Sequence, residues 1–280
     1  MTTEHPKAIL DRFGLQPKKS LGQNFLFDDQ ILAQITVAAE LTPDDEVLEI
    51  GPGLGSLTRH LAQAARRVVA VELDDRLLPL LHRELALYPQ VEIVHGDILT
   101  QDPGQLFPDR AYKVVANVPY YITAAILRHV LSGPVKPVLL VMTVQKEVAQ
   151  RLLAEPDEMS LLAVSVQFYG RPTLVGTIRA GAFWPRPEVD SAIVRVDLRR
   201  RDVISADEAT FFRVVRAGFS QKRKQLKNNL RGLGFSAESL SQALSQAGVD
   251  GRRRAETLSL TEWANLTAQL VAAAAPVSPP

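Results

Sequence analysis

Short apolar runs alternate with amphipathic stretches along the first half of this 280-residue chain. The runs have the length of buried strands, and between several of them the apolar residues recur at helical spacing, as over residues 76–87. Strands that alternate with helices predict a parallel sheet covered by helices on both faces. The predicted strands are residues 47–50, 68–71, 91–94, 114–116 and 138–141.

Two further apolar runs, residues 173–178 and 192–197, follow without a long helix between them. We therefore expect them to form a hairpin at one edge of the sheet. After three consecutive arginines at residues 199–201, the strand signals disappear and the pattern becomes helical. This change marks the expected domain boundary.

The fold class predicted from this pattern is α/β, a Rossmann-like sheet with a small all-helical C-terminal domain. The α/β domain should take residues 1–200 and the helical domain residues 201–270. Residues 271–280 are rich in Ala and Pro and are expected to be a flexible tail.

Composition narrows the possible functions. The chain contains no cysteine, and its five histidines are scattered without the spacing of metal ligands, so no metal site is expected. It lacks both a run of about eighteen apolar residues and an apolar N-terminal signal, so we expect no membrane contact and a cytoplasmic location. No exposed apolar helix demands a partner copy, so a monomer is expected.

A glycine-rich turn, Ile-Gly-Pro-Gly-Leu-Gly at residues 50–55, connects the first of these strands to a helix. Gly51 and Gly53 allow a tight turn and a close approach of backbone N–H groups to a ligand, although such turns are often purely structural. A dinucleotide fingerprint would need glycine at position 56, which is Ser56, and Pro52 removes a donor that a pyrophosphate would use. The turn thus favours a nucleoside that carries no phosphate.

Two carboxylates end the next strands. Glu72 can accept both hydroxyls of a ribose, and Asp97 can accept a hydrogen bond from an adenine amine. Glu72 could also be a solvated acid at a strand end. With the glycine turn, however, the two acids describe a nucleoside pocket along the carboxyl edge of the sheet, and S-adenosylmethionine is the expected cofactor.

The fourth strand ends in residues 117–120, Asn-Val-Pro-Tyr. The exocyclic amine of adenine is a weak nucleophile because its lone pair is delocalised into the ring. Two acceptors, the Asn117 side-chain oxygen and the Pro119 carbonyl, can localise that lone pair, and Tyr120 can stack on the base. Out of context the segment could be an ordinary turn. Downstream of a nucleoside pocket, it predicts methyl transfer to adenine.

A second aromatic and proline cluster lies at residues 183–187, Phe-Trp-Pro-Arg-Pro. Its prolines favour an extended loop. Phe183 can cover the other face of the base, or it can simply fill the core beneath the edge strands.

Together these segments resemble the bacterial small-subunit rRNA adenine dimethyltransferases linked to kasugamycin sensitivity. The resemblance covers nearly the whole chain, and two departures are visible. Tyr121 stands where the family usually has Asn, and Trp184 stands where it often has a small residue. The matching segments, in order, are residues 19–26, 49–54, 71–74, 96–97, 117–120, 145–148 and 183–191.

The resemblance implies that the Rossmann-like sheet is of the S-adenosylmethionine-dependent methyltransferase type, and it implies an activity and a more complete site. The family transfers two methyl groups from S-adenosylmethionine to N6 of each of two adjacent adenosines, in the 3′-terminal hairpin loop of small-subunit rRNA. The partner implied is this rRNA within the immature 30S particle, and the reacting base must be flipped out of its stack. The residues implied at the cofactor are Asn24, Leu26, Gly51, Glu72, Asp97 and Asn117.

A cationic surface is expected near the C-terminus. If residues 212–231 form a single helix, one arc of about 60° is apolar and the adjacent arc of about 100° is basic. Residues 218–220, Gly-Phe-Ser, could instead divide it into two helices. A basic arc suits phosphate contact but could also be merely solvated. The principal RNA-binding candidates are Arg223, Lys224 and Lys227, and residues 252–254 add a second basic cluster.

Three other functions compete with this one. The chain could be an assembly factor that recognises the small subunit without catalysis, although its pocket residues are intact. It could be a large-subunit rRNA methylase of the antibiotic-resistance type, which the basic segment 220–224 and the C-terminal helices disfavour. A DNA adenine methyltransferase would more often carry Asp-Pro-Pro-Tyr than Asn-Val-Pro-Tyr.

Overall fold

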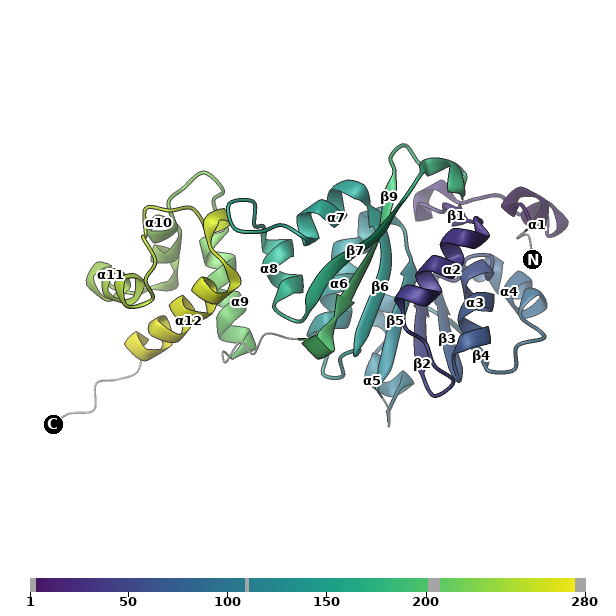
Figure 1. The fold of residues 1–280 in the computed structure, drawn as a ribbon, viewed down its shortest axis with the longest axis horizontal. Coiled ribbons are helices and arrows are strands. Elements are labelled where there is room, and N and C mark those ends of the chain that lie inside the picture. Colours follow the sequence, from purple (N-terminus) through teal and green to yellow (C-terminus); the bar gives the residue numbers. More distant parts are fainter. Residues whose placement is uncertain (1–3, 109–110, 201–206, 275–280) are drawn as a thin grey trace. The chain divides into compact units, whose positions relative to one another are not determined.

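The computed structural model describes residues 4–108, 111–200 and 207–274, and within it the chain forms two compact units (Figure 1). The first unit contains residues 4–149 and 171–200. The second contains residues 150–170 and 207–274. The predicted boundary, at residues 199–201, falls at the edge of the described residues, because residues 201–206 lie outside them.

A seven-stranded sheet forms the first unit, in the order β4-β3-β2-β5-β6-β9-β7. The first five strands in this order pair in parallel, whereas β9 is antiparallel to both β6 and β7. The predicted edge hairpin is therefore confirmed, as are the five predicted parallel strands. The strands are β2 (Glu46–Ile50), β3 (Arg67–Glu72), β4 (Val91–His95), β5 (Tyr112–Asn117), β6 (Leu139–Gln145), β7 (Arg171–Ile178) and β9 (Ser191–Asp197).

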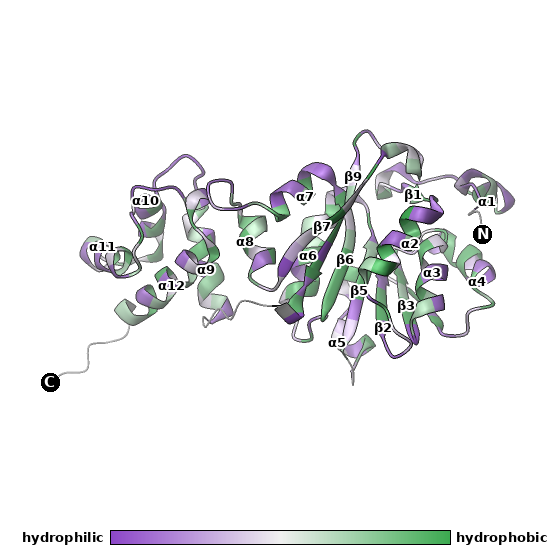
Figure 2. Ribbon diagram, in the orientation of Figure 1, coloured by the Kyte–Doolittle hydropathy of each residue, from purple (hydrophilic) through white to green (hydrophobic). Residues whose placement is uncertain are grey.

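The sheet is buried on both faces. On one face, Leu32 and Leu61 pack with Val115 in a single apolar cluster, whereas the alternate strand residues Leu48 and Val114 point to the other face and are equally buried. Figure 2 shows the central strands mostly green and the helices mixed. The helices that begin in this unit are α1 (Pro6–Arg12), α2 (Asp29–Ala38), α3 (Ser56–Ala64), α4 (Leu78–Glu84), α5 (Pro103–Leu106), α6 (Thr123–Ser132) and α7 (Lys146–Leu152).

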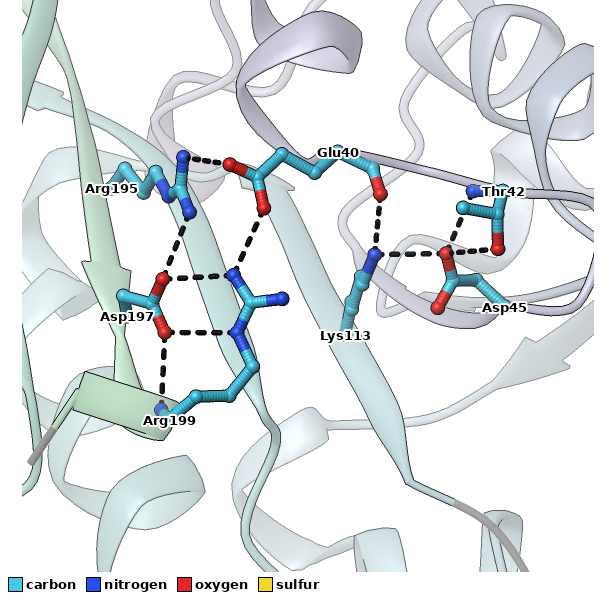
Figure 3. Close-up of polar contacts among 7 residues, drawn as sticks. All are labelled: Glu40, Thr42, Asp45, Lys113, Arg195, Asp197 and Arg199. Carbon is cyan, nitrogen blue, oxygen red and sulfur yellow. Dashed lines mark hydrogen bonds and ion pairs between the residues drawn. The ribbon is translucent and has the colours of Figure 1, made fainter.

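An ion-pair network ties the amino edge of the sheet together (Figure 3). The Glu40 carboxylate accepts hydrogen bonds from Arg195 at 2.6 Å and from Arg199 at 2.9 Å. The carbonyl of Glu40 accepts from the buried Lys113 ammonium at 2.6 Å, which also binds Asp45 at 2.8 Å. The connection from α2 to β2 is thus anchored to β5 and β9, at the edge opposite the carboxyl ends of the parallel strands.

The second unit is helical. Its core contains Trp263 and Phe211, both fully buried. Its helices are α8 (Leu161–Gln167), α9 (Glu208–Gly218), α10 (Leu226–Leu230), α11 (Ala237–Gln246) and α12 (Leu260–Ala274). Residues 150–170, which the sequence assigned to the α/β domain, lie here because Phe168 packs on Phe211 with ring centroids 4.6 Å apart.

Two details of this unit bear on the sequence prediction. Residues 212–231 form two helices, the alternative indicated by the Gly-Phe-Ser segment at residues 218–220, because α9 ends at Gly218 and α10 begins at Leu226. Gly218 lies so close to Trp263 that a β-carbon would come within 2.3 Å of the indole ring. The packing of Trp263 therefore requires glycine at the end of α9. The predicted tail also starts too early, since residues 271–274 complete α12, and residues 275–280 lie outside the described residues.

Candidate active site

The glycine turn that follows β2 opens a pocket at the carboxyl edge of the sheet. Gly51 has φ +70° and Gly53 has φ +59°, values that favour glycine. A β-carbon on Gly53 would lie 3.0 Å from the ring of Phe25, which packs over the turn. The turn thus needs glycine both for its backbone conformation and for this close approach.

Glu72 is fixed at the end of β3 by backbone donors. Its carboxylate accepts from the Gly53 N–H at 3.2 Å and from the Asp74 N–H at 2.8 Å, and the residue is only 6% exposed. Burial raises the pKa of Glu72, while these hydrogen bonds act in the opposite direction. Its position next to the glycine turn matches the predicted ribose acceptor.

The N-terminal segment reaches the pocket through a short strand pair. Strand β1 (Phe25–Leu26) pairs antiparallel with β8 (Phe183–Trp184), which places Leu26 opposite Phe183. Both side chains are buried and both line the pocket. This pairing explains how two segments from opposite ends of the first unit contribute to one site.

Gln23 anchors the segment that precedes β1. Its side-chain oxygen accepts from the Lys18 N–H at 2.7 Å, and its amide nitrogen donates to Asp74 at 2.8 Å. Asp74 also pairs with Arg76, whose guanidinium lowers the pKa of that carboxyl. Asn24, next along the chain, donates to the Gly22 carbonyl at 3.0 Å and lines the pocket.

Asn117 ends β5 and is oriented from the neighbouring strand. Its side-chain oxygen accepts a hydrogen bond of 2.5 Å from the hydroxyl of Thr143, the residue paired with it on β6. Thr143 is fully buried, whereas Asn117 is half-buried and lines the pocket. A carbonyl oxygen has two lone pairs, so Asn117 retains acceptor capacity for a substrate.

Tyr120 is held through its hydroxyl. That hydroxyl lies 2.5 Å from the hydroxyl of Ser191 on β9, and burial raises the pKa of Tyr120. The Pro119 carbonyl accepts only a long hydrogen bond of 3.4 Å, from the Ile122 N–H, so it too retains acceptor capacity. The ring of Tyr120 and the two predicted acceptors therefore line the same pocket.

Every residue predicted for the cofactor and the reacting base lines this single pocket. Phe183 lines it and is also a member of the buried core, so both interpretations of its role agree with its position; Trp184 is not among the lining residues. The predicted residues brought together here are Asn24, Leu26, Gly51, Gly53, Glu72, Asp97, Asn117, Pro119, Tyr120 and Phe183.

The lining of the pocket is acidic. It contains the carboxyl groups of Glu49, Glu72 and Asp97, and no Lys, Arg or His among the described residues. One oxygen of Glu49 is buried without a hydrogen-bond partner, and burial raises the pKa of Glu49 to about 8. A lining of acceptors without cations suits S-adenosylmethionine, because this nucleoside has a positively charged sulfonium and ammonium and contains no phosphate. The residues present thus fit this cofactor.

Glu49 and Ser191 enter the sequence prediction only as members of family motifs, and Thr143 does not enter it. Glu49 is an acid within a predicted apolar strand, and it is only 1% exposed. Thr143 and Ser191 gave no signal, because their roles depend on which strands are neighbours.

The three RNA-binding candidates belong to the second unit, whereas the pocket residues belong to the first. Arg223 and Lys224 lie between α9 and α10, and Lys227 lies on α10; all three are exposed. The other basic residues of the predicted arc, Arg213, Arg216 and Arg231, are exposed as well.

Comparison with known proteins identifies the family. Residues 14–271 match the family model of the ribosomal RNA adenine dimethylases. The chain belongs to this family. Its match spans both units, so the helical unit is part of the shared architecture, and S-adenosylmethionine is the cofactor of this dimethylase.

Similar proteins agree with this assignment. A protein named ribosomal RNA small subunit methyltransferase A, from Dehalococcoides mccartyi, is 47% identical over 92% of this dimethylase and 89% of its own length. A protein of the same name from Moorella thermoacetica is 44% identical over 94% of this dimethylase and 96% of its own length.

Solved structures share the fold. The 23S rRNA methyltransferase ErmE has a TM-score of 0.72 at 32% identity, covering 89% of this dimethylase and 100% of ErmE. A dimethyladenosine transferase from Plasmodium falciparum has a TM-score of 0.79 at 24% identity, covering 89% and 98%. In the part of the chain that the structure describes, no helix could cross a membrane and no acidic or histidine cluster could hold a metal.

Proposed function

We propose that this dimethylase methylates N6 of two adjacent adenosines in the 3′-terminal hairpin loop of small-subunit (16S) rRNA, giving N6,N6-dimethyladenosine during 30S biogenesis. The observation that carries the proposal is the position of Asn117, Pro119 and Tyr120 in a pocket whose described lining contains carboxyl groups and no Lys, Arg or His. The small-subunit target is supported by the names of relatives that are 44–47% identical over nearly the whole chain. The large-subunit enzyme ErmE is less similar, at 32% identity.

The cofactor, when bound, supplies an electrophilic methyl group on a sulfonium. We assign its ribose to Glu72 and its adenine amine to Asp97. The glycine turn with Gly51 and Gly53, together with Asn24 and Leu26, encloses the rest. Burial raises the pKa of the carboxyl groups of Glu49 and Glu72, and the positive charge of a bound donor would act in the opposite direction and favour their ionised form.

Asn117 and Pro119 hold the reacting amine. Their oxygens accept its two hydrogens, which localises the nitrogen lone pair towards the methyl group and places the reacting atoms in line. Thr143 fixes the direction of the Asn117 oxygen through the 2.5 Å hydrogen bond. No base is needed before attack, because the ammonium product is acidic and releases its proton afterwards.

Tyr120 and Phe183 sandwich the flipped adenine. The hydroxyl bond from Tyr120 to Ser191 holds one ring, and the β1–β8 pair holds the other. Stacking on such rings contributes about 1–3 kcal/mol per base. A loop adenosine is the natural substrate because it is easily unstacked.

The helical unit binds the RNA backbone. Arg223, Lys224 and Lys227 are exposed and carry the charge that phosphates require. We assign the immature 30S particle as the partner, the cytoplasm as the location and a monomer as the active form.

The test is methylation of purified unmethylated 30S particles with labelled S-adenosylmethionine, with 50S particles as the matched control. Mass spectrometry of the digested rRNA should find dimethyladenosine at two adjacent loop positions of the small subunit only. Label on 50S particles, or on neither, would contradict the proposal. Asn117→Ala should abolish the label. If the protein were a pure assembly factor, the wild type and Asn117→Ala would not differ in label.

A further inference from the structure

Tyr121 is an exposed aromatic residue at the mouth of the pocket. Its side chain is 63% exposed, although the residue lines the same pocket as the buried groups. It directly follows Tyr120, whose hydroxyl is engaged with Ser191. Within the described residues, the Tyr121 hydroxyl makes no hydrogen bond. A large ring left in water at the entrance of a base pocket has a free face for a second flat partner.

The ring is supported from one side. Gly22 lies so close that a β-carbon there would be 3.2 Å from both Pro119 and the Tyr121 ring. The φ of +59° at Gly22 favours glycine at this position. The N-terminal segment therefore holds an edge of Tyr121 in place while much of its surface stays open.

Positive charge lies just before Gly22 in the same segment. Lys18 and Lys19 are exposed, and neither forms an ion pair within the residues that the structure describes. The pocket itself presents carboxyl groups and no described cation. Acceptors for the nucleosides thus line the pocket, whereas two cations that suit phosphate contact lie on the adjoining segment.

We propose that Tyr121 is the stacking platform for the nucleotide next to the reacting adenosine, and that Lys18 and Lys19 contact the phosphates of the same single-stranded run. This inference rests on the proposed function. A base that flips into the pocket leaves its neighbour without a stacking partner, and an exposed aromatic ring at the entrance replaces that partner. For two adjacent adenosines, the neighbour held by Tyr121 is the other substrate, so the residue positions the second target while the first reacts.

The experiment uses small-subunit particles assembled with rRNA in which 2-aminopurine replaces the adenosine next to the reacting one. Its fluorescence falls when the base stacks on a ring. The full-length wild type should quench it, and Tyr121→Ala should remove the quenching and raise KM for particles by roughly 5- to 150-fold. Tyr121→Phe should behave as wild type, because it retains the ring. Leu87→Ala, which changes a side chain that is 90% exposed and outside the pocket lining, is the matched surface control.

Two further measurements separate stacking from a structural role. The affinity for S-adenosylmethionine, measured by calorimetry without RNA, should be the same in Tyr121→Ala and wild type. Replacing Lys18 and Lys19 by Ala should lower the salt dependence of particle binding, by a log–log slope of about 0.7 per lysine on a single strand. Equal KM and equal quenching in Tyr121→Ala and wild type would overturn the inference while wild-type methylation continues. Absence of wild-type methylation on natural particles would instead overturn the proposed function.

Discussion

Thr143→Val tests whether the buried hydroxyl on β6 orients Asn117 for catalysis. Valine replaces the hydroxyl by a methyl group of nearly the same size, so the change leaves no cavity in the core. The change removes the 2.5 Å hydrogen bond to the Asn117 oxygen. Asn117 is half-buried and opens to the pocket, so water can satisfy the released oxygen and the cost in unfolding free energy should be small.

The expected magnitude follows from the bond itself. An intramolecular hydrogen bond contributes about 0.5–1.5 kcal/mol net, and here it acts on the orientation of an acceptor for the reacting amine. If the whole amount appears in the activation barrier, kcat falls roughly 2- to 12-fold, since 1.36 kcal/mol is tenfold in rate. The cofactor affinity should not change.

Thr143→Ser is the matched control, because it keeps the hydroxyl and removes a buried methyl group. It should retain kcat but lose about 1 kcal/mol of unfolding free energy, the reverse of the valine variant. Single-turnover methylation of 30S particles measures the first quantity, and denaturant unfolding measures the second. A wild-type rate in Thr143→Val would refute the orienting role of this residue.

Three other predictions concern charge and backbone. Burial holds the pKa of Glu49 near 8 against 4.5 for the free group, so the folded state binds an extra proton between these pH values and the free energy of unfolding should fall as pH rises from 4.5 to 8. Glu49→Gln should remove that fall when unfolding is measured as a function of pH, and an unchanged slope would contradict the assignment. Lys113→Met removes a buried ammonium together with its hydrogen bonds to the Glu40 carbonyl and the half-buried Asp45 carboxylate, and should lower the unfolding free energy by about 1–3 kcal/mol. Glu40→Gln, at a carboxylate that is 47% exposed, should cost less than about 1 kcal/mol, and equal losses in thermal melts would contradict the role of burial. Gly53→Ala places a β-carbon on a residue in the left-handed backbone region and against the Phe25 ring, so calorimetry should show S-adenosylmethionine binding weakened about tenfold or more. An affinity equal to that of the wild type would show that the turn can relax.

The sheet was predictable because its strands are short, apolar and separated by helical periodicity. The pocket was predictable where chemistry is local to one strand end, as for Glu72 and Asn117. The roles of Thr143 and Ser191 were not, because each depends on strand register across the sheet. Periodicity alone carries no information about neighbours.

The helical unit shows a different limit. The spacing of apolar and basic residues could not decide whether residues 212–231 form one helix or two. In the structure Gly218 packs against Trp263, and α9 ends there. Residues 150–170 join this unit through aromatic packing between Phe168 and Phe211. A contact between distant segments decides both cases, and such contacts cannot be read from a local pattern.

The pairing of β1 with β8 has a consequence for the order in which the enzyme acquires its site. The segment with Asn24 and Leu26 leaves the ribosome early, whereas its partner strand follows only after nearly the whole first unit has been translated. Such a contact of high sequence separation forms late, because loop closure over a long chain is slow. A nascent or stalled chain that ends before Phe183 therefore has the glycine turn but lacks the strand that holds the N-terminal segment across it. The enzyme becomes competent to retain its methyl donor only once its catalytic unit has been synthesised to the end.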